Sequence, residues 1–379
     1  MSAIQIANQP VSSRLRIGLV APPWLTVPPI GYGGTERVIA LLADGLVERG
    51  HDVTLFAAAG SDTRANLVTP LASAPPFINS GRDDETFHAL TAFLAADEFD
   101  VVHDHTTLGP VFAAIHDGGP PVVHTLHGPW TPGVRRTLGL IADRVNLVAI
   151  SHAQRAANPH VRYAGVVHNG VDIDAHPFCA DKEDYLVFVG RINAEKGPET
   201  AVDVAHAAGL PLTMIVKRSE PEEWEYWDKI VLPRLDDSVT VIEQPPHHLK
   251  AELVGRAKAA LCPINWPEPF GLVLAEALAC GTPVITRPLG AAPEIVVHGE
   301  NGFLCDTTRE MVDAVARIDE ISPRVCHEHA AELFSADAMV SGYERIYESV
   351  LARAGGRLAA TAGAAAAGAN TRRLYVTSP

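Results

Sequence analysis

Short apolar runs, separated by glycine- or proline-containing loops and by helical patterns, constrain the fold of this 379-residue chain more than any other feature. Most of the runs are rich in β-branched residues and short, as buried parallel strands are. They occupy 14–21, 53–57, 101–103, 122–126, 147–150 and 165–168, and then 184–190, 212–216, 239–242, 259–263 and 284–286. Strands that alternate with helices in this way predict an α/β fold built on parallel sheets.

The runs fall into two series, and the chain is long enough for two domains that each bury a core. From residue 354 to residue 379 the chain is rich in Ala, Gly and Thr and has little to bury, which predicts a disordered tail. We expect a flexible N-terminus at 1–13, a first α/β domain at 14–173, a linker at 174–183 and a second α/β domain at 184–340.

Composition and charge narrow the classes of function. A hydrophobic content of 47% and a charged content of 20% are those of a soluble globular protein. The formal net charge of -15 argues against nucleic acid as a partner and weakens adhesion to an anionic membrane. The five cysteines are scattered and odd in number, which fits neither a disulfide framework nor a zinc knuckle. With no signal peptide or membrane-spanning run in the pattern, we expect a cytoplasmic protein without a transmembrane segment.

The stretch from 268 to 286, EPFGLVLAEALACGTPVIT, contains the most informative helix. The pattern predicts that the helix begins near Gly271 or Leu272 and ends before Gly281, which favours a left-handed cap. Glu276 is the one interior residue that is neither apolar nor small, so we expect it to be buried. A buried carboxylate needs hydrogen-bond donors, and the small neighbours leave room for a ligand with two adjacent hydroxyls, such as a ribose.

The start of this helix suits an anion, because its first N–H groups have no partner inside the helix and Gly271 lets a ligand approach closely. Glu276 lies roughly 6 to 7 Å further along the axis at 1.5 Å per residue, a separation that suits the phosphate and ribose of one nucleotide. The alternative, a Glu276 that faces solvent or pairs with a lysine, stays open.

Two further loops carry candidate ligand groups. Arg191 and Lys196 follow the strand run at 184–190, and two cations at the mouth of such a loop suit a diphosphate, although loop cations are often only solvated. Gly33 and Gly34 end a proline-rich loop after the first strand run. Their spacing is not that of a dinucleotide fingerprint, so they indicate either a ligand contact or a tight turn.

Histidines follow two of the predicted strands. His127 comes directly after the run at 122–126, at the edge where ligands of open α/β sheets bind, although a lone histidine is more often structural. His103, Asp104 and His105 resemble a metal cluster, but neighbouring residues on a strand point to opposite faces. The two histidines then share a side without Asp104, and we predict a structural role and no metal site.

Glu268 and Glu276, seven residues apart around the sequence PFG, resemble the double-glutamate signature of glycosyltransferase family four. The likeness extends to VGRINAEKG at 189–197, which resembles the phosphate-binding segment of that family, and to GAAPEIV at 290–296 and NGFLCD at 301–306. The resemblance implies a GT-B fold, in which two Rossmann-like doubly wound parallel-sheet domains face each other across a cleft. It also implies a terminal helix, at 341–353, that crosses back to the first domain.

The resemblance further implies a metal-independent, retaining transfer of a hexose-type sugar from a UDP-, GDP- or ADP-sugar to the hydroxyl of a small molecule, saccharide or lipid. No other cofactor is implied. The implied catalytic residues are His127, Glu268, Arg191 and Lys196, and the implied donor-binding residues are Gly33, Gly34, Arg191, Lys196, Glu268, Phe270, Gly271, Leu272 and Glu276. In these roles Arg191, Lys196 and the helix start stabilise the departing diphosphate, Glu276 binds the ribose, Glu268 and Phe270 contact the sugar, and His127 lies beside the reacting carbon.

Two other readings of the same motifs stay open. One is a different chemistry on the same fold, a sugar-nucleotide epimerase or a phosphorylase. The other is a non-catalytic protein that binds nucleotide sugars. These motifs do not indicate the base of the nucleotide, the sugar that is transferred, the acceptor or the oligomeric state of the protein.

Overall fold

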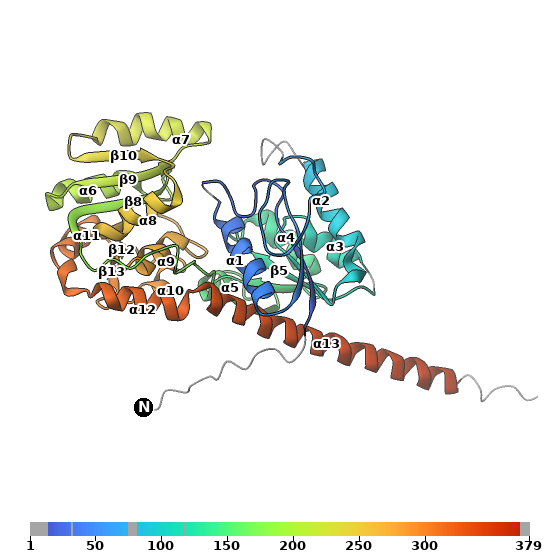
Figure 1. Cartoon of the computed structure of the whole chain (residues 1–379). Coiled ribbons are helices and arrows are strands. Elements are labelled where there is room, and N and C mark those ends of the chain that lie inside the picture. Colours follow the sequence, from blue (N-terminus) through green and yellow to red (C-terminus); the bar gives the residue numbers. More distant parts are fainter. Residues whose placement is uncertain (1–13, 32, 75–81, 117, 372–379) are drawn as a thin grey trace, which may run out of the picture.

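The computed structural model describes residues 14–31, 33–74, 82–116 and 118–371, and it consists of two parallel sheets with helices packed on both (Figure 1). The predicted flexible N-terminus at 1–13 lies outside the described residues. None of the helices in the described parts of the chain is both long and apolar enough to cross a membrane.

The first sheet has seven strands in the order β3-β2-β1-β4-β5-β6-β7. The strands are β1 (Arg16–Val20), β2 (Asp52–Phe56), β3 (Asn66–Val68), β4 (Val101–Asp104), β5 (Val122–Leu126), β6 (Asn146–Ala149) and β7 (Tyr163–Val166). Its helices are α1 (Gly34–Glu48), α2 (Arg82–Leu94), α3 (Gly109–Ile115), α4 (Pro132–Ile141) and α5 (His152–Ala156), with a short 3-10 turn at Ala96–Glu98. The strand order reverses direction between β1 and β4, which is where ligands of doubly wound sheets bind.

The second sheet has six strands in the order β10-β9-β8-β11-β12-β13. The strands are β8 (Glu183–Arg191), β9 (Leu212–Lys217), β10 (Val239–Glu243), β11 (Ala257–Cys262), β12 (Val284–Thr286) and β13 (Gly302–Leu304). Its helices are α6 (Pro198–Ala208), α7 (Pro221–Tyr226), α8 (His247–Arg256), α9 (Leu272–Ala279), α10 (Ala292–Ile295), α11 (Thr308–Ala316) and α12 (Pro323–Leu333), with short turns at Trp227–Val231, Leu232–Arg234 and Ile318–Glu320. Neighbouring strands of both sheets run parallel, as predicted.

The last helix, α13 (Ala336–Thr371), returns to the first sheet and continues past it (Figure 1). The segment that we expected to cross, 341–353, places Tyr343, Tyr347 and Val350 in the same apolar core as α1. The helix continues to Thr371, where the sequence predicted a disordered tail from 354, because alanine has the highest helix propensity. Residues 372–379 lie outside the described residues.

A buried ion pair joins α13 to the first sheet. Glu344 is 6% exposed, pairs with the guanidinium of Arg49, and has its Oε1 3.1 Å from Nε2 of His51. Arg49 follows the end of α1 and also donates to Ser341 Oγ at 2.8 Å. One nearly buried carboxylate therefore adds a polar contact to the apolar packing of α13 on the first sheet.

We expect Glu344→Ala to lower the melting temperature by roughly 4–8 °C, because it removes charge-assisted hydrogen bonds of about 1.5–3 kcal/mol and leaves Arg49 without its buried partner. Differential scanning calorimetry measures the shift. The matched control is Glu348→Ala, one turn further along α13 at an exposed position, which should change the melting temperature by no more than about 1–2 °C. Equal shifts in the two variants would contradict the role of Glu344.

Candidate active site

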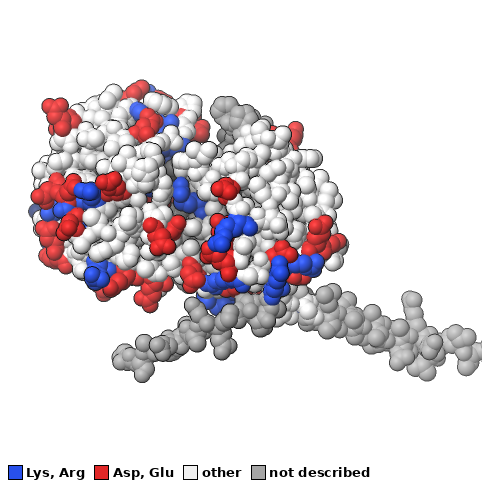
Figure 2. Space-filling view, in the orientation of Figure 1, with Lys and Arg blue, Asp and Glu red and all other residues white. Residues whose placement is uncertain are grey.

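A cavity of about 470 Å³ lies between the two sheets, at the carboxyl ends of their strands. Its wall is formed by the loop before α1, the residues after β5, the ends of β8, β9 and β11, and the start of α9. Basic side chains lie in the groove between the two halves on the face that Figure 2 shows. The cavity brings together all the catalytic and donor-binding residues predicted from the sequence except Arg191, namely Gly33, Gly34, His127, Lys196, Glu268, Phe270, Gly271, Leu272 and Glu276.

The start of α9 faces the cavity, as the sequence predicted. Gly271 has a φ of +99°, a left-handed conformation that side chains rarely adopt, and it precedes the first helical residue, Leu272. Leu272 and Val273 line the cavity, and their N–H groups belong to the first turn, where helical partners are lacking. Gly34 approaches from the other half, because a Cβ there would lie 3.0 Å from Cδ1 of Leu272. Two glycines thus keep the helix start open to a ligand.

Glu276 lines the cavity and is 7% exposed, but it has a partner that the sequence did not reveal. Nζ of Lys250, on α8, donates to Oε2 of Glu276 at 2.8 Å, and Nε2 of His176 lies 3.9 Å from Oε1. Burial alone would raise the pKa of Glu276, but the nearby Lys250 and the histidines outweigh it and lower the pKa to about 2. The expectation that small neighbours leave this carboxylate without a side-chain partner is wrong. The pairing with a lysine, kept open from the sequence, is what the structure contains.

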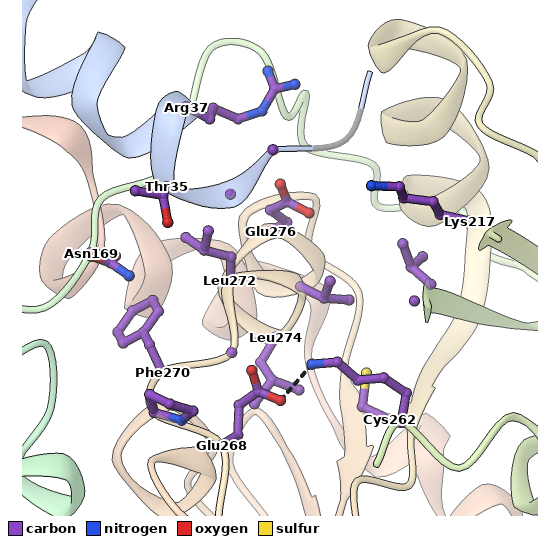
Figure 3. A pocket seen from close by; sticks show the side chains of 18 of the residues that line it. Thr35, Arg37, Asn169, Lys217, Cys262, Glu268, Phe270, Leu272, Leu274 and Glu276 are labelled. Carbon is purple, nitrogen blue, oxygen red and sulfur yellow. Dashed lines mark hydrogen bonds and ion pairs between the residues drawn. The ribbon is translucent and has the colours of Figure 1, made fainter. Parts of the chain in front are cut away.

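Glu268 is fixed at the other end of the cavity (Figure 3). Its Oε2 accepts a hydrogen bond from Nζ of Lys196 at 2.5 Å and another from the indole N–H of Trp266 at 2.8 Å. The main chain is held too, because the N–H of Ala291 donates to the carbonyl of Glu268 at 2.9 Å. Gly290 permits this contact, since a Cβ there would lie 2.3 Å from the same carbonyl oxygen. The residue predicted for the sugar and the lysine predicted for the phosphates are therefore one ion pair before a donor binds.

Arg191 is directed elsewhere. Its guanidinium lies 3.4 Å from Glu223 and 3.5 Å from Glu195, and it is not among the described residues that line the cavity. Lys217, its register partner at the end of β9, does line the cavity and was missed from the sequence. Burial lowers the pKa of Lys217. The signal for Lys217 was its position at the carboxyl end of a predicted strand, the same edge from which Lys196 was identified.

His127 lies in the cavity wall and belongs to a buried histidine cluster. His105 Nδ1 and His127 Nε2 are 2.9 Å apart, and burial lowers the pKa of His127 to about 3, so its ring is neutral at physiological pH. His103 hydrogen-bonds to Tyr347 and Thr125, each at 2.8 Å. The ring centroids of His103 and His105 are 4.1 Å apart, which confirms that the two histidines share one side.

Asp104 points to the opposite side of β4, as predicted, and its Oδ2 lies 2.7 Å from Nδ1 of His124. The two histidines and Asp104 therefore make separate sets of polar contacts on opposite sides of β4. Neither group of three potential metal ligands found among the described residues includes any of the three.

Two family models match this chain. Residues 32–175 match the model of the family described as Glycosyltransferase Family 4, and residues 173–325 match that of Glycosyl transferases group 1. The D-inositol 3-phosphate glycosyltransferase of Mycolicibacterium smegmatis is 28% identical over 87% of this chain and 90% of its own length.

Two solved structures have the same architecture. AviGT4, a glycosyltransferase involved in avilamycin A biosynthesis, is 27% identical with a TM-score of 0.66, covering 89% of this chain and 98% of AviGT4. Anabaena HepE in complex with UDP and glucose is 20% identical with a TM-score of 0.69, covering 89% of this chain and all of HepE, and shares the fold. The first model matches most of the part of the chain that forms the first sheet, and the second matches the part that forms the second sheet. Because the two models together span residues 32–325 and the architecture is shared, this chain belongs to the family-four glycosyltransferases with the GT-B fold.

Proposed function

We propose that this glycosyltransferase moves a hexose-type sugar from a nucleoside-diphosphate sugar to a hydroxyl acceptor, with retention of the anomeric configuration and without a metal ion. One observation carries the proposal: Glu276, the start of α9 and the Lys196–Glu268 pair line a single cavity, with His127 in the wall from the other sheet. In this arrangement the ribose lies at Glu276, the diphosphate at the helix start and Lys196, and the sugar at Glu268 and Phe270.

The leaving group explains why cations and a helix start are needed together. As the bond between the sugar carbon and the diphosphate oxygen breaks, negative charge grows on the phosphate, and preorganised donors stabilise it. Lys196 and the N–H groups at the start of α9 supply these donors within the cavity. Arg191 is proposed as a further phosphate ligand, which requires it to leave Glu195 and Glu223.

The proposed reaction needs no added base. The acceptor oxygen bonds to the sugar carbon on the face from which the diphosphate departs, and the acceptor proton goes to the departing phosphate oxygen. The neutral ring of His127 lies beside the reacting carbon and contributes a polar contact without adding positive charge. Gly33 and Gly34 let the loop before α1 approach the donor, because a Cβ at Gly33 would lie 2.7 Å from Pro29.

We expect one of the UDP-, GDP- or ADP-sugars to raise thermal stability markedly more than the others, because a ligand at about 100 times its Kd adds about 2.7 kcal/mol to the folded state. Differential scanning fluorimetry with each sugar nucleotide measures this and identifies the donor base. Because a relative is named for D-inositol 3-phosphate, phosphorylated polyols are the first acceptors to test with that donor.

The product then separates the alternatives. Proton NMR of the product should show the anomeric configuration of the donor, and EDTA should leave the rate unchanged. An inverted product would overturn retention, and a rate lost with EDTA would overturn metal independence. Conversion of the sugar nucleotide in the absence of any acceptor would favour an epimerase. Tight donor binding without any product across the acceptor panel would favour the non-catalytic protein.

A further inference from the structure

Three potential metal ligands converge at the ribose end of the cavity. His176 comes from the connection between the sheets, His247 is the first residue of α8, and Glu276 is on α9. One ligand atom from each lies within 4.8 Å of the other two. Potential ligand atoms from three separate segments of the chain therefore lie close together at this end of the cavity.

The hydrogen bonding of His176 leaves its Nε2, on the side of Glu276, without a hydrogen-bond partner among the described residues. The ring is 2% exposed, and its Nδ1 must donate to the carbonyl oxygen of Asp172, 2.7 Å away, because that oxygen can only accept. Nε2 of the same ring lies 3.9 Å from Oε1 of Glu276, beyond hydrogen-bond distance. Nε2 of His176 and Nε2 of His247 are both buried without a hydrogen-bond partner among the described residues. Two unpartnered nitrogens beside a carboxylate form a site for a cation.

Zinc is the ion that fits this donor set. Two imidazole nitrogens and one carboxylate oxygen are a common three-ligand zinc set, with water in the fourth position. The His176–Asp172 hydrogen bond is the outer contact that metal-binding histidines usually make. Bonds of about 2.0–2.1 Å in a tetrahedron place ligand atoms roughly 3.3 Å apart. The 3.9 Å between His176 and Glu276 therefore has to close by about 0.6 Å, and the other two distances, which are within 4.8 Å, by at most about 1.5 Å.

Lys250 opposes a cation but does not block it. Its Nζ binds Oε2 of Glu276, which leaves Oε1, the oxygen nearer to His176, for a metal. The positive charge of Lys250 should weaken the affinity for zinc, so the site is expected to fill and empty reversibly.

A second group, His152, His168 and Glu294, has the same composition but not the same vacancy. Both oxygens of Glu294 already accept backbone N–H groups, from His152 at 2.9 Å and Ala153 at 2.7 Å, and His168 Nε2 adds a third contact at 2.9 Å. Since both oxygens of its carboxylate are already occupied, this second group is a matched control.

We propose that His176, His247 and Glu276 bind Zn²⁺, and that bound zinc excludes the nucleotide donor because both require the carboxylate of Glu276. The zinc site stands on the geometry alone, whereas the competition rests on the proposed function of Glu276. Zinc is then a reversible inhibitor whose effect decreases as donor concentration rises.

Direct metal binding tests the site. The full chain is titrated with Zn²⁺ by calorimetry, and with Co²⁺, whose visible absorption bands report four-coordinate nitrogen and oxygen ligands. His247→Gln and His176→Gln should each lower zinc affinity at least about tenfold, the lower end of the cost of disturbing even outer contacts. The His152→Gln and His168→Gln double variant should bind zinc as the parent does. His247 begins a helix and is partly exposed, so its variant serves if His176→Gln does not fold. A parent chain that binds neither metal, or histidine variants that bind both unchanged, would overturn the proposal.

Competition separates the two claims. With the sugar nucleotide found by the thermal screen, micromolar zinc should raise the apparent donor KM and leave kcat unchanged in the parent, with little effect in His247→Gln. If zinc binds through the histidines but donor affinity does not change, the metal site stands and the ribose assignment fails. If donor binding requires Glu276 but no metal binds, the ribose assignment stands and the zinc site fails.

Discussion

Replacing Lys196 with alanine is expected to lower kcat/KM by about 100-fold, with most of the loss in kcat. Lys196 is the cation paired with Glu268 inside the cavity, and the charge on a departing diphosphate would draw on the same ammonium group. Loss of one preorganised donor to such a charge costs about 10²–10³ in kcat. Steady-state kinetics with the identified donor give the two constants separately, and a loss confined to KM would mean that Lys196 binds the ground state and the transition state equally.

Arg191→Ala provides the contrast, because Arg191 pairs with Glu195 and Glu223 instead of lining the cavity. We expect this variant to lose no more than about tenfold in kcat/KM, and less if Arg191 keeps its acidic partners when donor is bound. Lys229→Ala, which breaks an exposed pair with Glu225, should change nothing measurable. A 100-fold loss in Arg191→Ala beside a near-normal Lys196→Ala would exchange the roles of the two cations.

Helix and strand positions were predictable where the signals are local. α6 begins at Pro198 and ends before a left-handed Gly209, and α9 ends where Gly281 and Pro283 prevent a further turn, so their limits follow from neighbouring residues. β3 and β13, with three residues each, were not predicted. β12 is equally short, but it was predicted because it directly follows the end of α9 at Gly281 and Pro283. The terminal helix expected at 341–353 is the middle part of α13, and two shorter helices, α11 and α12, precede it, with Pro323 at the start of α12.

The sequence predicted most of the residues that line the cavity, but it did not predict which of them form ion pairs with one another. Lys250 and Glu276 are 26 residues apart, and Lys196 and Glu268 are 72 apart, so only the folded sheet order brings each pair together. One pairing could have been inferred. His105 and His127 follow β4 and β5, and neighbouring parallel strands present their carboxyl ends side by side. The sequence reading treated the two histidines separately and missed this contact.

Replacing Glu276 with alanine is expected to raise the Kd of the donor by about 100-fold, because two hydrogen bonds from ribose hydroxyls to a carboxylate are worth about 1.5–3 kcal/mol each and Lys250 is left without its partner. Glu276→Gln keeps one acceptor oxygen of the same shape and should lose only about tenfold. Calorimetric titration with the donor measures both. The nucleoside diphosphate alone should show the same losses, because the proposed contact is to the ribose and not to the sugar.

The charge on Glu276 also makes a stability prediction that is independent of the donor. Its pKa in the folded state is about 2, below the ordinary value of 4.5, so the ionised form favours folding above about pH 4.5 and this contribution decreases as the pH falls toward 2. The difference in melting temperature between the parent and Glu276→Gln should therefore be largest near neutral pH and shrink below pH 4.5. If that pH dependence appears while Glu276→Gln binds the donor as tightly as the parent, the carboxylate serves only to fix α8 against α9 through Lys250, and the ribose must contact another part of the cavity.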